Sequence, residues 1–206
     1  MTPTLYVTPG ACSLACHVVI EEVSLPIDVV PVDLRDPAAP HRAFNPLGRV
    51  PTLVTANGEV LTENSALLPY LADLAPQSHL LAPTGTVVRA QTQAWVGYLN
   101  AEIHAGCFRA INRPQRYCPD AQGQATVREQ GLLRLHEALG PIETALRGRD
   151  TLVGEHFSIA DAYLGVFASW VRALGDAFTP FTELYRFGTT YEQRPSVMRA
   201  RARELQ

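Results

Sequence analysis

The spacing of apolar residues changes once along this chain, and that change restricts the fold more than any other feature. Up to the first proline-rich stretch near Ala75, short β-branched runs alternate with helix-compatible segments. From about Thr86 onward the strand signals fade and only helical patterns remain. This order predicts a small α/β domain over residues 1–78, a linker, and an all-helical domain over residues 87–206.

The first domain is expected to hold four strands and two helices. In chain order, the predicted elements are strand Thr4–Thr8, helix Leu14–Val23, strand Ile27–Leu34, strands Val50–Val54 and Val60–Thr62, and helix Ser65–Leu74. Asn57-Gly58 is a preferred pair for a hairpin turn. Pro31 cannot donate to a sheet ladder, so its strand should lie at an edge. A βαβ unit followed by a ββα unit gives a mixed four-stranded sheet with helices against it, the layout of a thioredoxin-like domain.

The second domain is expected to contain only helices. They are predicted at Val87–Ile111, Ala125–Leu146 and Ser158–Leu174, with further helix in the tail that is interrupted at Arg194-Pro195. Ser158 and Asp161 have the spacing of a capping box. Arg199, Arg201 and Arg203 alternate along the last helix and are interpreted as a solvated face, with an anion site as the less favoured alternative.

Composition argues against several classes of protein and partner. The net charge of −3 includes no basic run, so no nucleic-acid partner is expected. No apolar run approaches the ~18 residues that span a bilayer, so no membrane partner is expected. The four cysteines are sparse and unevenly spaced, which favours free thiols in a reducing compartment. The expected location is therefore the cytoplasm.

Cys12 is the first candidate for chemistry. It follows a Pro-Gly-Ala turn and stands at the start of a predicted helix, where unpaired N–H groups and the helix dipole favour an anion. We therefore expect a lowered thiol pKa and a partly ionised sulfur near neutrality. The alternative is that Cys12 is a small buried apolar residue. Cys16, one turn further on, is taken as core; with His17 it makes a poor metal site, and no metal is expected.

Three further places carry polar groups that a ligand would use. Pro51 opens a predicted strand, and a cis Val50–Pro51 bond would expose the Val50 backbone to a peptide-like ligand, whereas a trans bond is the common case. Glu63-Asn64 precedes a helix, where the residues either cap it or bind an amine and a carboxylate together. His104 lies inside a helix, where a lone histidine is more often packed or solvated than catalytic.

Five segments resemble, in order, motifs of the cytosolic glutathione S-transferases, and specifically of their bacterial beta class. They are Tyr6–His17 (YVTPGACSLACH), Asn45–Leu53 (NPLGRVPTL), Leu61–Asp73 (LTENSALLPYLAD), Trp95–Gly106 (WVGYLNAEIHAG) and Gly154–Tyr163 (GEHFSIADAY). The first looks like the motif with the active-site cysteine, the second like the segment around the cis-proline. The last is similar to the capping motif of the helical domain. Together they cover nearly the whole chain.

The resemblance implies the glutathione S-transferase fold, glutathione as co-substrate, and a homodimer. The site residues that it implies are Cys12 facing the glutathione sulfur, Leu34 nearby, Val50 ahead of cis Pro51 on the cysteinyl backbone, Glu63 and Asn64 on the γ-glutamyl end, and Glu102, Ile103 and His104 facing the same cleft, with His104 close to the sulfur. Cys12 would stabilise the glutathione thiolate or form a mixed disulfide with it.

The sequence departs from the beta-class pattern where relatives carry polar or cationic residues. Gly97 replaces an asparagine, Ala105 replaces a lysine, and the loop near Asp36 lacks the lysine that in relatives reaches the glycyl carboxylate. Each lost charge-assisted hydrogen bond is worth roughly 1.5–3 kcal/mol, so weaker glutathione binding is expected. Arg35, Arg49 and Arg113 are the candidates to compensate.

The function that the resemblance implies is that of a glutathione transferase acting on a small hydrophobic electrophile, with thiol transfer and peroxide reduction as further cysteine-based activities. The apolar face of the helical domain would bind the electrophile. The alternative from another class is a non-catalytic binding or regulatory protein of the same fold, because of the lost cations. A dithiol oxidoreductase is disfavoured because no Cys-x-x-Cys is present.

Overall fold

The computed structural model describes residues 2–205, and its first part is a mixed sheet with two helices. Its elements are β1 (Thr4–Val7), α1 (Leu14–Val23), β2 (Asp28–Pro31), β3 (Thr52–Val54), β4 (Val60–Thr62) and α2 (Asn64–Asp73). The strand order is β2-β1-β3-β4, with β1 parallel to β2 and antiparallel to β3. The predicted four-stranded sheet is confirmed, and β2, which contains Pro31, lies at its edge.

The hairpin between β3 and β4 uses the turn that the sequence indicates. Val54 pairs with Val60, and the Gly58 N–H donates to the Thr55 carbonyl at 2.9 Å. Gly58 has φ of +84°, a left-handed conformation that favours glycine. The strand itself begins at Thr52, two residues later than predicted, after a Val50–Pro51 peptide bond that is cis.

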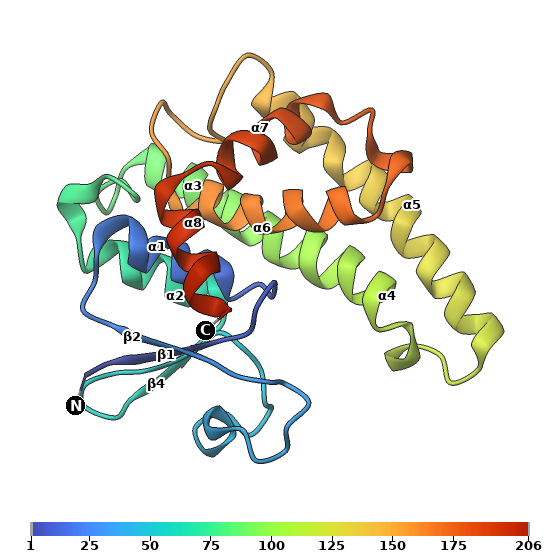
Figure 1. The fold of residues 1–206 in the computed structure, drawn as a ribbon. Coiled ribbons are helices and arrows are strands. Elements are labelled where there is room, and N and C mark those ends of the chain that lie inside the picture. Colours follow the sequence, from blue (N-terminus) through green and yellow to red (C-terminus); the bar gives the residue numbers. More distant parts are fainter. Residues whose placement is uncertain (1, 206) are drawn as a thin grey trace.

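In the described residues of the second part of the chain, helices are the only regular elements, and loops join them (Figure 1). Its main elements are α3 (Val87–Tyr98), a π-helix (Leu99–Phe108), α4 (Arg109–Asn112), α5 (Ala121–Leu146), α6 (Ile159–Ala173), α7 (Thr182–Glu192) and α8 (Pro195–Glu204). The predicted single α-helix over Val87–Ile111 is one continuous helix whose middle ten residues wind as a π-helix, a rare form that is frequent at functional sites. Helix α5 begins earlier than predicted because Asp120 accepts from the Gly123 N–H at 2.8 Å.

Helix α6 is the centre of the helical part. The predicted capping box is present, and the Ser158 N–H donates to the Asp161 carboxylate at 2.9 Å. Most of α6 is buried, including Tyr163 and Phe167, which are 0% exposed. Gly165 meets the ring of Tyr191 so closely that a Cβ would come within 2.2 Å of it. No helix within residues 2–205 is long and apolar enough to cross a bilayer.

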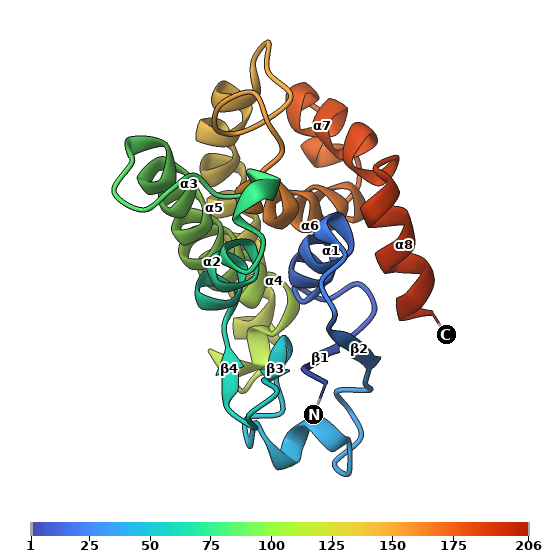
Figure 2. The same ribbon diagram turned by 90° about the vertical axis from the view of Figure 1, so that its left-hand side faces the viewer.

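Helix α1 joins the two parts of the molecule. It packs against α2, α6 and α8, and eight of its ten residues are buried (Figure 2). Because α1 is covered by helices of the second part, its sequence shows a nearly continuous apolar run, Leu14–Ile20, interrupted only by the buried His17. The loop that precedes α1 therefore lies at the junction, next to the helices of the second part.

Candidate active site

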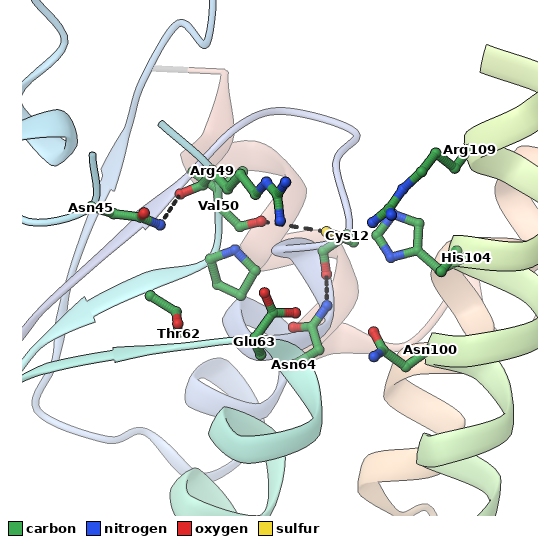
Figure 3. Close-up of a pocket in the computed structure, with 12 residues that line it drawn as sticks. Cys12, Asn45, Arg49, Val50, Thr62, Glu63, Asn64, Asn100, His104 and Arg109 are labelled. Carbon is green, nitrogen blue, oxygen red and sulfur yellow. Dashed lines mark hydrogen bonds between the residues drawn. The ribbon is translucent and has the colours of Figure 1, made fainter. Parts of the chain in front are cut away.

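A small cavity opens where the sheet part meets the π-helix (Figure 3). We call it the inner cavity, and it has a volume of about 100 Å³. It is lined by Cys12, Asn45, Arg49, Val50, Pro51, Thr62, Glu63, Asn64, Asn100, His104, Ala105 and Arg109. Residues from four separate regions of the chain thus surround one space.

Cys12 is held in the loop between β1 and α1. The Thr8 N–H donates to the Ser13 hydroxyl at 3.1 Å, and the Asn64 side chain donates to the Cys12 carbonyl at 3.0 Å. The Cys12 thiol itself donates to the Val50 carbonyl at 3.5 Å (Figure 3). These contacts fix the direction of the sulfur from both sides of the cavity.

The predicted lowering of the Cys12 pKa is wrong for this structure. Burial raises the pKa of the thiol to about 12, and the charge of Glu63 raises it further, although hydrogen bonds from the backbone and Asn64 oppose both. Cys12 also lies outside α1, because Ser13 is the residue that precedes the helix. The loss of hydration thus outweighs the helix dipole, and Cys12 is a protonated donor near neutrality.

The N-terminus of α2 supplies a carboxylate and backbone donors. Glu63 precedes the helix with φ of +68°, a conformation that costs about 1–3 kcal/mol outside glycine and is found at ligand sites. Its side chain is exposed to the cavity. The Asn64 side chain is buried, and its Oδ1 accepts from the Cys16 thiol at 3.1 Å. Asn64 is therefore engaged by both cysteines, and Cys16 is core as predicted.

His104 projects from the π-helix towards Cys12 (Figure 3). Burial lowers the pKa of His104 to about 4, and the Arg109 charge acts in the same direction, so the ring is neutral near pH 7. The Tyr163 hydroxyl donates to Asn100 Oδ1 at 3.1 Å and lies 3.3 Å from His104 Nδ1. Because the hydroxyl has one proton, His104 Nδ1 must donate in the second contact, which leaves Nε2 as an acceptor.

The structure brings most of the predicted site residues together. Cys12, Val50, Pro51, Glu63, Asn64 and His104 line the inner cavity, and Leu34 lines a larger cavity beside it. Two residues do not join them, contrary to expectation. Ile103 is 0% exposed in the core, and the Glu102 carboxylate lies 3.6 Å from the Arg134 guanidinium. Consecutive helical residues point in different directions, so only His104 of the three faces the cleft.

Sequence reasoning missed Arg109, which lines both cavities and whose guanidinium lies beside His104 (Figure 3). Of the three compensating cations that were considered, Arg49 lines both cavities, Arg113 lines the larger one, and Arg35 lines neither. Arg109 lies five residues after His104, a spacing that puts two side chains on one face in a π-helix but not in an α-helix. Because the π-helix was not predicted, no local signal pointed to Arg109.

The larger cavity, which we call the outer cavity, has a volume of about 650 Å³, within the range of small-molecule sites. It shares Cys12, Arg49, Val50, His104 and Arg109 with the inner cavity, so the two are continuous. Phe108 and Trp170 give it an apolar wall. Six arginines also line it, whereas the sequence led us to expect an apolar pocket. Within residues 2–205, no group of three or more His, Cys, Asp or Glu side chains is placed to hold a metal ion.

Comparison with known proteins identifies the family. Family models for the N-terminal and C-terminal domains of glutathione S-transferases match residues 10–74 and 104–195. The glutathione S-transferase GstA of Escherichia coli O157:H7 is 34% identical over 207 residues, covering 97% of this chain and 98% of that protein. The solved beta-class glutathione S-transferase of Sphingomonas chungbukensis has a TM-score of 0.86 at 31% identity, over 98% of both chains. A sphingomonad glutathione S-transferase complexed with glutathione has a TM-score of 0.84 at 32% identity, with the same coverage. The chain therefore belongs to the glutathione S-transferase family and is similar to its bacterial beta class.

Proposed function

We propose that this protein is a glutathione transferase, in which the thiolate of bound glutathione attacks an electrophilic substrate. One observation supports this most strongly: the Cys12 thiol, the Val50 backbone and the N-terminus of α2 open on one cavity beside Arg49 and Arg109. A γ-glutamyl tripeptide needs such a set, because it carries an ammonium, two carboxylates and a thiol. The relatives named as transferases favour an enzyme over a non-catalytic binding protein.

The roles follow from the charge and protonation of each group. Glu63 would pair with the γ-glutamyl ammonium, and the α2 N-terminus would receive the neighbouring carboxylate. The Val50 backbone would pair with the cysteinyl unit. Arg49 and Arg109 would replace the missing lysines as counter-charges, and their positive potential would lower the pKa of the glutathione thiol.

Cys12 would act as a hydrogen-bond donor to the glutathione sulfur. Its pKa of about 12 leaves it protonated near neutrality, so donation is favoured over the mixed disulfide that the resemblance also allowed. Neutral His104 would accept the thiol proton or orient the sulfur through Nε2, held in place by Tyr163. Thiol transfer and peroxide reduction would then be minor activities.

The oligomeric state, the biological role, the location and the domain division are also proposals. We expect a homodimer and a role in detoxification by analogy with the family, and a cytoplasmic location because Cys12, Cys16, Cys107 and Cys118 are all free thiols. The chain would divide into the predicted domains, residues 1–78 and 87–206, whose first and last residues, Met1 and Gln206, lie outside the described range.

The proposal is tested by calorimetric titration of glutathione into the reduced wild type, Cys12→Ser and Cys118→Ser. Cys118 is the matched control, because it is also a partly exposed thiol but lines neither cavity. Micromolar to millimolar binding is expected, altered in Cys12→Ser and unchanged in Cys118→Ser. Absence of binding to the wild type would favour the non-catalytic protein.

A reactivity measurement separates the two roles of Cys12. A thiol with a pKa of about 12 should be alkylated by iodoacetamide at neutral pH more slowly than free cysteine. Peptide mass spectrometry would follow modification of Cys12 itself. Alkylation faster than that of free cysteine would show a reactive thiolate and restore the mixed-disulfide role.

A further inference from the structure

The outer cavity concentrates positive charge in a chain whose net charge is negative. All 17 basic side chains of the sequence are arginine, and the net charge is −3. Six of these arginines line the outer cavity, whereas no carboxylate lines it among residues 2–205. The six are Arg42, Arg49, Arg109, Arg113, Arg116 and Arg128.

These six arginines are not neutralised by the protein. Within residues 2–205, seven arginines of the chain form an ion pair with a carboxylate, and none of the seven lines the outer cavity. Arg42 donates to the Leu34 carbonyl at 2.9 Å, and Arg128 donates to the Ile111 carbonyl at 2.8 Å. A carbonyl acceptor orients a guanidinium without cancelling its charge, so the positive potential of the cavity remains.

Glutathione does not account for all of this charge. Arg49 and Arg109 line both cavities and point towards Cys12, so they are placed to serve the tripeptide (Figure 3). The other four line only the outer cavity. Gathering unpaired cations around one space is unfavourable in the free protein, and a bound anion would relieve it.

The wall beside these arginines is aromatic. The rings of Phe108 and Trp170 lie 5.0 Å apart in an edge-to-face arrangement, and His104 lies 5.5 Å from Trp170. The Trp170 indole N–H donates to the Gly10 carbonyl at 2.9 Å, which fixes the ring against the loop that carries Cys12. An apolar, planar group would pack here, close to the reacting sulfur.

We propose that the electrophile of this enzyme is an anion: a flat, conjugated molecule that carries a carboxylate or a similar oxyanion. This rests on the proposed transferase function and names its substrate class. The conjugated part packs against the partly exposed Trp170 of this wall, and the oxyanion is bound by the exposed Arg113 and Arg116. Guanidinium groups suit this role because their paired N–H donors match a carboxylate.

The test uses 4-chloro-3,5-dinitrobenzoate and its methyl ester, which share one reactive carbon and differ in charge. In both, the glutathione sulfur forms a C–S bond, chloride leaves with the C–Cl electron pair, and the thiol proton goes to solvent. Each kcat/KM is divided by the uncatalysed rate constant with free glutathione, which removes the difference in intrinsic reactivity. The corrected carboxylate-to-ester ratio is the measured quantity.

The variants are Arg113→Gln, Arg116→Gln and the double substitution, with Arg147→Gln as control. Arg147 is an exposed arginine that lines neither cavity. The wild type should favour the carboxylate, and the double variant should lower the ratio at least about tenfold, while Arg147→Gln leaves it unchanged. Arg116→Lys should restore part of the loss, and circular dichroism confirms that each variant is folded.

Three results would overturn the inference in distinguishable ways. A ratio near one in the wild type, with the ester turned over, defeats the anionic substrate and leaves the transferase intact. An equal fall for both probes with a raised KM for glutathione assigns the two arginines to glutathione instead. Failure to bind glutathione or to convert either probe defeats the proposed function itself.

Discussion

Arginines serve opposite purposes in two regions of this molecule. At the junction of α1 and α8, which we call the seam, Arg194 pairs with Glu22, and Arg199 and Arg203 both pair with Glu21. Around the outer cavity, no arginine has a carboxylate partner within residues 2–205. The same side chain is neutralised in one region and left charged in the other.

The seam adds to one interpretation of the sequence. Arg199, Arg201 and Arg203 are partly exposed to solvent, as interpreted, but each is also ion-paired: the first and last with Glu21 of α1, and Arg201 with Glu192 of α7. These pairs attach the last helix to the first helix and to its neighbour. In these two regions, the paired arginines join helices to one another, whereas the unpaired ones surround the outer cavity.

The largest expected effect comes from reversing a charge in the cavity. Arg109→Glu places an anion beside the sulfur site, so kcat/KM with glutathione should fall at least about a hundredfold. The free energy of unfolding should change by no more than about 0.5 kcal/mol, because Arg109 is exposed and forms no ion pair with a carboxylate within residues 2–205. Steady-state kinetics and urea unfolding measure the two quantities. A loss of stability with unchanged kinetics would show that Arg109 has a structural role and does not bind a ligand. Arg147→Glu is the control.

Removing a charge from the seam should do the opposite. Glu21→Gln leaves Arg199 and Arg203 without their shared acceptor, so the free energy of unfolding should fall by about 2 kcal/mol. The estimate is at the low end for a buried group because both arginines are about half exposed. Glu129→Gln, at an exposed position outside the seam, should shift stability by less than about 0.5 kcal/mol. A loss below about 0.5 kcal/mol in Glu21→Gln, as small as in the control, would show that the seam pairs are dispensable.

A smaller effect is expected in the pH dependence of stability, because His104 in the cavity and Glu21 in the seam contribute over different pH ranges. The pKa of His104 falls from its ordinary 6.5 to about 4 through burial and the Arg109 charge. The folded protein therefore binds this proton less readily than the unfolded chain. His104 accordingly contributes stability above pH 6.5 that is lost as the pH falls towards 4.

Glu21 contributes to stability with a dependence on pH that lies in a lower pH range than that of His104. Burial alone would raise its pKa, but hydrogen bonds from Arg203 and Arg199 outweigh it and hold the pKa below 4.5. Its contribution is present above pH 4.5 and is lost below it. His104→Gln should flatten the stability profile between pH 6.5 and 4, and Glu21→Gln only below 4.5. Urea titrations across pH 3–8 would test this, and flattening in the same window for both variants would contradict it.

The sequence predicted most of the fold because local signals agreed with the tertiary structure. Helix α1 has the predicted bounds Leu14–Val23, and the capping residues Ser158 and Asp161 mark the start of α6. The π-winding over Leu99–Phe108 was not predictable, because its apolar spacing is close to that of an α-helix. For the same reason, the sequence did not show which residues of this helix face the cleft, and Ile103, expected there, lies in the core.

The site was predicted less completely, because its properties arise between distant segments. Burial in the folded protein is the main cause that raises the pKa of Cys12, and its contacts there, Val50 and Asn64, lie far along the chain, so its helix-terminal position alone suggested the wrong direction. The cationic cavity draws its arginines from the loop before β3, from the π-helix and α4 region, and from α5. No window of the sequence contains that concentration of charge.

The π-winding also sets which side chains share a direction. The Arg109 N–H binds the His104 carbonyl, five residues back, where an α-helix would bond four residues back. Deleting a single residue between Asn100 and His104 would let the helix regain its ordinary pitch. The side chains that follow in this helix, including Arg109, would then be rotated about the helix axis and would point in other directions. The positive charge of the cavity therefore depends on the winding of this helix as well as on its arginines. A change in the length of the helix would alter that charge even if every arginine were kept.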